Sequence, residues 1–257
     1  MKARLCLAAL VLAACASAVP QRDIPAPRSG IAFTSDDVRR LQADDADNPG
    51  MLWVTRGEVL WREPAGAGRA SCASCHGAAE QSMRGVATRY PVIDRSTGAL
   101  LNLEGRIDQC RAQRQRADSL RYESEELLAL TSFVAYQSRG LPLQATIAGA
   151  AAPHFEAGRA QYVTRQGQLN LSCANCHERN WGRTMLAETV SQGHGNGFPA
   201  YRLEWQGLGS LHRRLRACQF GIRAEPAPAG SQSLVDLELY LAWRATGLPV
   251  EAPGVRR

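Results

Sequence analysis

The sequence carries one short motif twice, as Cys72-Ala73-Ser74-Cys75-His76 and as Cys173-Ala174-Asn175-Cys176-His177. Two cysteines separated by two residues and followed directly by histidine form the attachment motif of c-type haem. The two thiols form thioethers with the haem vinyl groups, and the adjacent imidazole binds the iron as its proximal ligand. A thioredoxin-like redox pair or a zinc knuckle does not require a histidine after each pair. We therefore expect two covalently bound haem c groups, each held by the two cysteines and the histidine of one motif.

The motifs belong to a tandem repeat with an offset of 101 residues (173 − 72). The same offset superposes Gly57 on Gly158 and Trp61 on Tyr162, within an expected helix ahead of each motif. After the motifs the halves drift apart by seven residues, in the stretch around residues 192–197. The repeat predicts that the two halves share one architecture.

The halves realign at an aromatic–proline pair, Tyr90-Pro91 in the first half and Phe198-Pro199 in the second. From each proline it is 19 residues (110 − 91 and 218 − 199) to a lone cysteine, Cys110 or Cys218. Apolar residues at steps of three and four precede each of these cysteines, which places both on the apolar stripe of a helix. Both thiols are therefore expected to face inward.

The pattern of helix signals predicts an all-α fold of two tandem cytochrome c-like domains, residues 48–146 and 147–257. Pro49 and Pro153 are expected in the first turns of the opening helices. Each half closes with a helix ended by glycine and proline, at Gly140 and Gly247, and Ser233 is the expected N-cap of the last helix. No alternating strand pattern competes with this reading.

Residues 1–18 have the pattern of an export signal, with a cationic start, an apolar stretch and a small-residue cleavage site. Residues 12–15 also resemble a bacterial lipobox, in which Cys15 would carry a lipid anchor. Either alternative predicts an exported, periplasmic protein, with residues 19–47 as an N-terminal extension. Cys6 and Cys15 then do not count among the structural cysteines, and six cysteines remain in the folded part of the chain.

Composition is that of a globular protein, because 45% of the 257 residues are hydrophobic and 21% are charged. Aromatic residues make up only 6%, so bound porphyrin is expected to complete each core. No apolar run reaches the ~18–20 residues of a membrane-spanning helix. The formal charge is +6, but the arginines are dispersed, which argues against a nucleic-acid partner.

The distal iron ligand decides the chemistry of each haem. The two lone cysteines are the favoured ligands, because the repeat places them equivalently; each could instead be a buried free thiol, or the two could form a disulfide. The other possible ligands are expected to be surface or core residues: His154, His194, His212, Met51, Met83 and Met185.

Arg106 and Arg214 each precede a lone cysteine by four residues, which is about one helical turn. Either arginine could pair with haem propionates or hold an anion beside the sulfur. The second half has the denser positive charge, from Arg213, Arg214, Arg216 and Arg223. Cys218 is therefore the better candidate for chemistry on an anionic substrate.

The second half also resembles a known family. The stretches Asn180-Trp181-Gly182, Ser191 to Arg202 and Gly209 to Pro226 closely resemble SoxA, the dihaem subunit of the SoxAX complex of thiosulfate oxidation. The resemblance covers essentially the whole mature chain and is most specific between residues 173 and 226. Some SoxA proteins lack the first haem, whereas this chain retains its complete motif and Cys110.

The resemblance implies an L-cysteine S-thiosulfotransferase, which joins thiosulfate oxidatively to a cysteine of the SoxYZ carrier protein. Two electrons leave through haem to a monohaem SoxX subunit. It further implies that Cys218 is the catalytic thiol, found as a persulfide in the family, and that Arg214 binds substrate. His76 with Cys110 would ligate one iron, and His177 with Cys218 the other. Two alternatives remain, a thiosulfate dehydrogenase that forms tetrathionate and a non-catalytic dihaem electron carrier.

Overall fold

The computed structural model describes residues 26–257. The predicted export signal at 1–18, the alternative lipobox at 12–15 and the start of the extension at 19–47 lie outside the described residues. The rest of that extension forms a 3-10 turn, Gly30–Phe33, and helix α1, Asp36–Ala43. Within residues 26–257, no helix is both long and apolar enough to cross a membrane.

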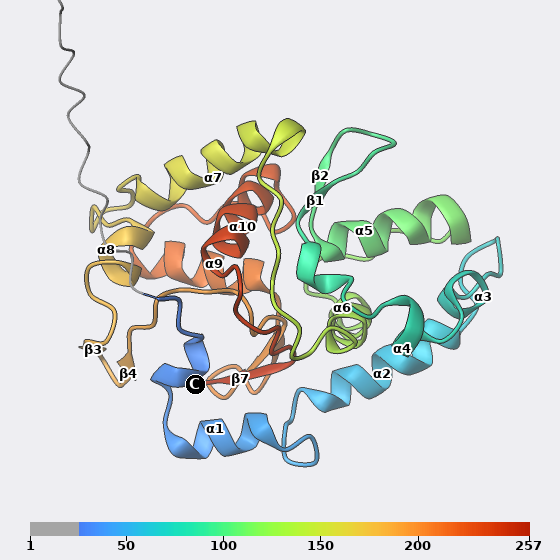
Figure 1. Cartoon of the computed structure of the whole chain (residues 1–257), viewed down its shortest axis with the longest axis horizontal. Coiled ribbons are helices and arrows are strands. Elements are labelled where there is room, and N and C mark those ends of the chain that lie inside the picture. Colours follow the sequence, from blue (N-terminus) through green and yellow to red (C-terminus); the bar gives the residue numbers. More distant parts are fainter. Residues whose placement is uncertain (1–25) are drawn as a thin grey trace, which may run out of the picture.

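Two similar series of elements follow along the chain (Figure 1). The first series consists of α2 (Met51–Arg62), α3 (Cys72–His76), α4 (Ala79–Ser82), a 3-10 turn (Ala87–Arg89), β1 (Val92–Ile93), β2 (Leu100–Leu101), α5 (Leu103–Cys110), a π-helical turn (Arg111–Gln115) and α6 (Glu125–Tyr136). The second consists of a 3-10 turn (Gly149–Ala151), α7 (Ala152–Val163), α8 (Cys173–His177), β3 (Thr184–Met185), β4 (Glu188–Thr189), β5 (Ala200–Arg202), β6 (Gly207–Gly209), α9 (Leu211–Gly221), α10 (Gln232–Arg244) and β7 (Gly254–Arg256).

A glycine lies at the main helix crossing of each series. Helix α2 packs on α6 and helix α7 packs on α10. A Cβ atom on Gly57 would lie 2.1 Å from the carbonyl oxygen of Ala129, and one on Gly158 would lie 2.0 Å from that of Asp236. The two backbones can approach this closely only because neither glycine has a side chain. Gly57 and Gly158, which the repeat pairs in the sequence, therefore both allow close packing of two helices.

The fold is mainly helical, as expected, but it is not purely helical, because residues 26–257 also contain three small sheets. Hairpins β1–β2 and β3–β4 are two-stranded, and β5 lies between antiparallel β6 and parallel β7. Each strand is only two or three residues long, too short to produce a recognisable alternating pattern. Pairing of Ala200 with Gly254 also joins segments distant in the sequence.

The hairpin β3–β4 explains the length difference between the halves. It lies between His177 and Ser191, where the first series has the short helix α4 instead. The additional residues therefore precede residue 192, earlier than the stretch of 192–197 that the sequence suggested.

Helix α6 is the centre of the core, since all its residues from 127 to 135 are buried. Its Phe133 clusters with Val54 and Trp61 of α2, but also with Leu248 and Val250 near the C-terminus. The C-terminal strand β7 packs in turn on α1, where the Gln42 side chain accepts a 3.0 Å hydrogen bond from the Val255 amide (Figure 1). The end of the second series thus stabilises the first series and the N-terminal extension.

Two expected helix starts need correction. Pro153 does lie in the first turn of α7, but Pro49 precedes α2, and the Asn48 side chain accepts a 2.9 Å hydrogen bond from the Gly50 amide there. Helix α10 begins before Ser233, with Ser231 at its N-cap. The two serine hydroxyls lie 3.2 Å apart, and the Ser231 side chain makes no capping hydrogen bond to the helix.

Candidate functional site

Each haem motif forms a short helix with a serine at its N-cap. Ser172 Oγ accepts from the Asn175 amide at 3.3 Å, and Asn175 Oδ1 accepts from the Ser172 amide at 2.9 Å, which forms a capping box. In α3, Ser71 accepts a 3.0 Å bond from the Ser74 amide. These caps begin a helical turn at the first cysteine, which brings the second cysteine, three residues on, to the same side.

The six predicted haem-site cysteines are all free thiols. Burial raises the pKa of Cys173 to about 11, and the nearby Cys218 adds to this rise. Cys218 acts in the same direction on Cys176, whose pKa is raised mainly by burial. Each lone cysteine therefore lies beside one motif, since Cys110 similarly adds to the burial that raises the pKa of Cys72. The alternative of a disulfide between Cys110 and Cys218 is not formed.

The two motif histidines have different surroundings. His177 Nδ1 lies 2.8 Å from the carbonyl oxygen of Ser191, which makes Nδ1 the protonated nitrogen and leaves the lone pair on Nε2. Burial lowers the pKa of His177, and the charges of Arg214 and Arg244 add to this effect. His76 is exposed, with its ring centroid 5.7 Å from that of Trp61, and its ring has no hydrogen-bond acceptor among the described residues.

The other histidines have protein partners. His154 Nδ1 lies 2.7 Å from Asp236 Oδ1, and His194 Nε2 lies 3.2 Å from Gln192 Oε1. Burial lowers the pKa of His194 to about 4. His212 accepts a 3.0 Å hydrogen bond from the Gly230 amide. Of the methionines, Met185 is exposed on β3, whereas Met51 and Met83 pack against the core of the first series.

The two register-equivalent arginines differ in their partners. Arg106 donates to Asp94 Oδ1 at 3.2 Å and to Gln109 Oε1 at 2.5 Å. Hydrogen bonds from Gln109 and from two hydroxyl groups hold the pKa of Asp94 far below its usual range, so this partner is an anion. Arg214 has no ion pair or side-chain hydrogen bond among the described residues, and its charge acts on His177 and Arg202.

Neighbouring arginines are fixed by an aromatic residue that the sequence did not single out. The guanidinium groups of Arg202 and Arg213 lie 5.0 Å and 4.3 Å from the ring centroid of Trp205. Arg202 is also paired with Glu204 at 2.7 Å and with Glu188 at 3.5 Å. Arg214 has neither kind of contact, so its charge remains available to an external anion. Arg216 and Arg223 likewise form no ion pair among the described residues.

The residues present fit haem c. Each motif offers two free thiols and an imidazole, and the lone cysteine adds a second possible axial ligand. Within residues 26–257 no set of three or more His, Cys, Asp or Glu residues could hold a metal ion, but a porphyrin brings four nitrogens of its own. Buried polar atoms without a protein partner also occur near the motifs, at Gln115 Oε1 and Tyr162 Oη. Burial raises the pKa of Tyr162, which keeps this phenol protonated.

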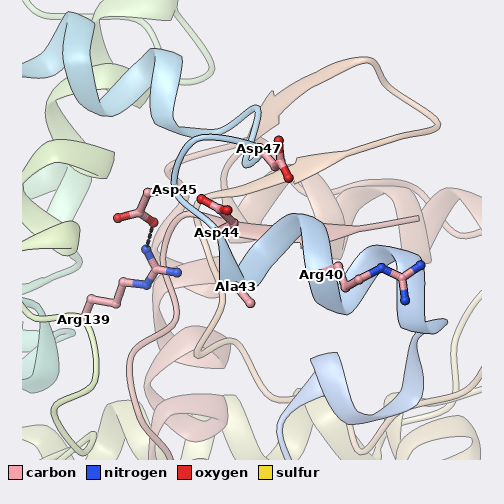
Figure 2. A pocket seen from close by; sticks show the side chains of 6 residues that line it. All are labelled: Arg40, Ala43, Asp44, Asp45, Asp47 and Arg139. Atoms are coloured by element: carbon pink, nitrogen blue, oxygen red, sulfur yellow. Dashed lines mark hydrogen bonds and ion pairs between the residues drawn. The ribbon is translucent and has the colours of Figure 1, made fainter.

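A surface hollow elsewhere on the chain contains none of the predicted site residues. It lies beside α1 and the loop that follows it, and is lined by Arg40, Ala43, Asp44, Asp45, Asp47 and Arg139 (Figure 2). Asp45 and Arg139 form an ion pair across it. Its exposed charged side chains are typical of a solvated surface.

The chain resembles characterised proteins along most of its length. A family model for the SoxA/TsdA cytochrome c domain matches residues 56–143. The SoxA subunit of L-cysteine S-thiosulfotransferase from Pseudaminobacter salicylatoxidans is 42% identical over 230 residues, covering 89% of this chain and 80% of that protein. This chain belongs to the SoxA family.

Further comparisons agree with membership of the SoxA family. The SoxA subunit from Paracoccus pantotrophus is 42% identical over 228 residues, covering 89% of this chain and 78% of the relative. The crystal structure of SoxXA from P. pantotrophus matches with a TM-score of 0.87 and 41% identity, covering 90% of this chain and 87% of that one. These results confirm the family and the cytochrome c-type fold, and with the family the predicted class, a thiosulfotransferase subunit.

Proposed function

We propose that this chain joins thiosulfate oxidatively to a cysteine of a SoxYZ-like carrier protein, with Cys218 as the reacting sulfur. The observation that carries the proposal is the position of the free Cys218 thiol beside the second haem motif, on the same helix as the unpaired Arg214. Arg214 binds the sulfonate end of thiosulfate, since guanidinium groups bind oxyanions through paired hydrogen bonds.

The reaction balances as an oxidation of two sulfur atoms. A carrier thiol and thiosulfate lose one proton and two electrons together, and a sulfur–sulfur bond forms between them. Cys218 can transfer sulfur by thiol–disulfide-type exchange, because a thiolate attacks sulfur and also leaves from it. Haem c would accept these electrons one at a time at each iron when it is bound, and would pass them on to the redox partner.

We further propose two haem c groups in two tandem cytochrome c-like domains, residues 48–146 and 147–257, with the active site in the second. The repeated motifs and the equivalent glycine crossings support this arrangement. Cys72 and Cys75 attach one haem, and Cys173 and Cys176 the other. His76 and Cys110 would hold one iron, and His177 and Cys218 the other, and the tautomer of His177 suits iron binding through Nε2.

The proposed redox partner is a SoxX-like monohaem cytochrome c that forms a heterodimer with this chain. The 41% identity to the chain in the SoxXA complex supports this choice. The export signal at residues 1–18 supports a periplasmic location, with a lipid anchor at Cys15 as the alternative. The intact mass of the mature protein would distinguish cleavage of the export signal from attachment of a lipid at Cys15.

The test compares Cys218→Met with the register-equivalent Cys110→Met in the holoprotein complex. Cys218→Met is expected to lower thiosulfate conjugation to a carrier peptide by a factor on the order of 10³ or more, with both haems still attached. Cys110→Met retains conjugation, because Cys110 ligates the other iron. Wild-type conjugation by Cys218→Met, or formation of tetrathionate without any carrier, would exclude the proposal.

A further inference from the structure

Gly85 and Gly193 occupy equivalent positions in the two series. Each lies five residues before an aromatic–proline pair (90 − 85 and 198 − 193). Their backbones are also alike, with φ of +74° at Gly85 and +75° at Gly193. A side chain at either position therefore costs similar backbone strain, since positive φ is unfavourable for residues other than glycine.

The surroundings of the two glycines differ. A Cβ atom on Gly193 would lie 2.7 Å from Cγ and 2.9 Å from Nδ1 of His177. A Cβ atom on Gly85 would meet only Leu141 Cδ1, at an ordinary 3.7 Å. The backbone of Gly193 therefore lies against the imidazole ring of the second motif, whereas Gly85 has no such contact with His76.

The His177 ring cannot simply move away from a larger residue at position 193. Its Nδ1 is hydrogen-bonded to the carbonyl oxygen of Ser191 at 2.8 Å, two residues from the glycine on the same loop. Ser191 also accepts, through Oγ, a 3.2 Å hydrogen bond from the Gly193 amide. Residues 191–193 thus hold the imidazole by one bond at its edge and one contact against its ring.

Residues 191–197, here called the proximal loop, are themselves fixed from several sides. The side-chain oxygen of Gln192 accepts a 2.6 Å hydrogen bond from the Arg28 amide. The backbone carbonyl oxygen of Gln192 accepts a 3.1 Å hydrogen bond from the Arg244 side chain. Asn196 donates to the carbonyl of Pro249 at 2.9 Å and to Ser29 Oγ at 3.0 Å. The N-terminal extension and the C-terminal segment therefore both keep the proximal loop against His177.

We propose that Gly193 is a positioning residue that sets the orientation of the His177 ring, and so distinguishes the second haem site from the first. This inference rests on the proposed haem attachment at the second motif. An axial imidazole's orientation and its Nδ1 hydrogen bond affect ligand basicity and iron potential. The first site has neither the hydrogen bond to the imidazole nor the glycine contact with its ring, because His76 is exposed and Gly85 lies away from it.

The experiment compares Gly193→Ala with Gly85→Ala as oxidised holoproteins. The measurements are the electron paramagnetic resonance g values and the reduction potential of each haem, with haem content from intact mass. Gly193→Ala is expected to shift the signals and potential of one haem, and Gly85→Ala to leave both sets unchanged. Unchanged signals in Gly193→Ala, or equal shifts in both variants, would overturn the proposal.

A second variant keeps the test decisive if Gly193→Ala does not accumulate. Asn196→Ala removes two anchors of the proximal loop without adding a group beside His177, and is expected to shift the signals of the same haem. Wild-type signals in Asn196→Ala would then contradict the proposal. Absence of haem from Cys173 and Cys176 in the unsubstituted protein would instead refute the proposed function, a separate result in the mass measurement.

Discussion

The buried imidazole of His212 on α9 lies 3.1 Å from Glu238 Oε2 on α10, with its Nε2 toward the carboxylate. Asn102, the N-cap of α5, donates to the same Oε2 atom at 3.0 Å. Tyr122 donates to Asn102 at 2.8 Å, and its ring stacks on His212 at 5.4 Å. This network connects the first series directly to the helix that carries Arg214 and Cys218.

A second buried carboxyl group, that of Glu104, makes the network sensitive to pH. Glu104 and Glu238 both line a small, partly open pocket of about 80 Å³. Burial, and then the charge of Glu238, raises the pKa of Glu104 from 4.5 to about 7. Burial opposes the charged form of His212, but Glu238, Glu104 and Glu123 outweigh it and raise the pKa of His212.

Glu104→Gln is expected to stabilise the protein at pH 8 and to have little effect at pH 4.5. The folded state binds the Glu104 proton more tightly than the unfolded state does. The stabilisation that protonated Glu104 gives the folded state is therefore complete below pH 4.5 and is lost as the pH rises through about 7. Glutamine resembles the protonated acid at every pH. Thermal unfolding across this range checks the prediction, with exposed Glu126→Gln as the control.

Gly158→Ala is expected to lower the free energy of unfolding by about 1–3 kcal/mol or more, because its Cβ would lie 2.0 Å from the Asp236 carbonyl oxygen. The backbone of α10 would have to move away from α7. Gly221→Ala, at the end of α9, has no atom within 4 Å of the new Cβ and serves as the control. Urea unfolding of the holoprotein measures both, and equal stability in the two variants would contradict the assigned crossing.

The parts of this fold that repeat were predictable from the sequence. Gly57 and Gly158, and the two lone cysteines, each follow from a local pattern that occurs twice, so a register error in one half would have been visible in the other. The sequence did not reveal the strand β7, because its pairing with β5 depends on residues more than fifty positions away. Local propensity contains no information on such a contact.

The same distinction applies to the candidate site. The motif residues and Arg214 follow from spacing, but the Ser191 carbonyl and the ring of Trp205 depend on how distant segments meet. The position of Gly193 could have been noticed from the sequence, since the register of the repeat pairs it with Gly85. The different partners of Arg106 and Arg214 also left a signal, because the same register places Arg202 where the first half has Asp94.

Arg214→Ala is expected to lower kcat/KM for thiosulfate by about 10- to 100-fold, the loss of one charged hydrogen-bond pair. Arg106→Ala is expected to change it less than twofold, since Arg106 is already bound to Asp94 and Gln109. Steady-state conjugation at varied thiosulfate concentration separates the two variants. Equal losses in both would indicate that these arginines serve the haem propionates rather than the substrate.

Gln42→Ala is expected to cost about 1–3 kcal/mol of unfolding free energy, because it leaves buried polar groups without partners. Gln42 Oε1 accepts from the Val255 amide at 3.0 Å and from Arg256, whose buried guanidinium otherwise has Glu251 at 3.1 Å. Burial lowers the pKa of Arg256, so this charge depends on its partners. Asp36→Ala, which removes only an exposed ion pair with Arg39, should change stability by less than about 0.5 kcal/mol. Urea unfolding that gave both variants the same stability would show that α1 does not hold the C-terminal strand.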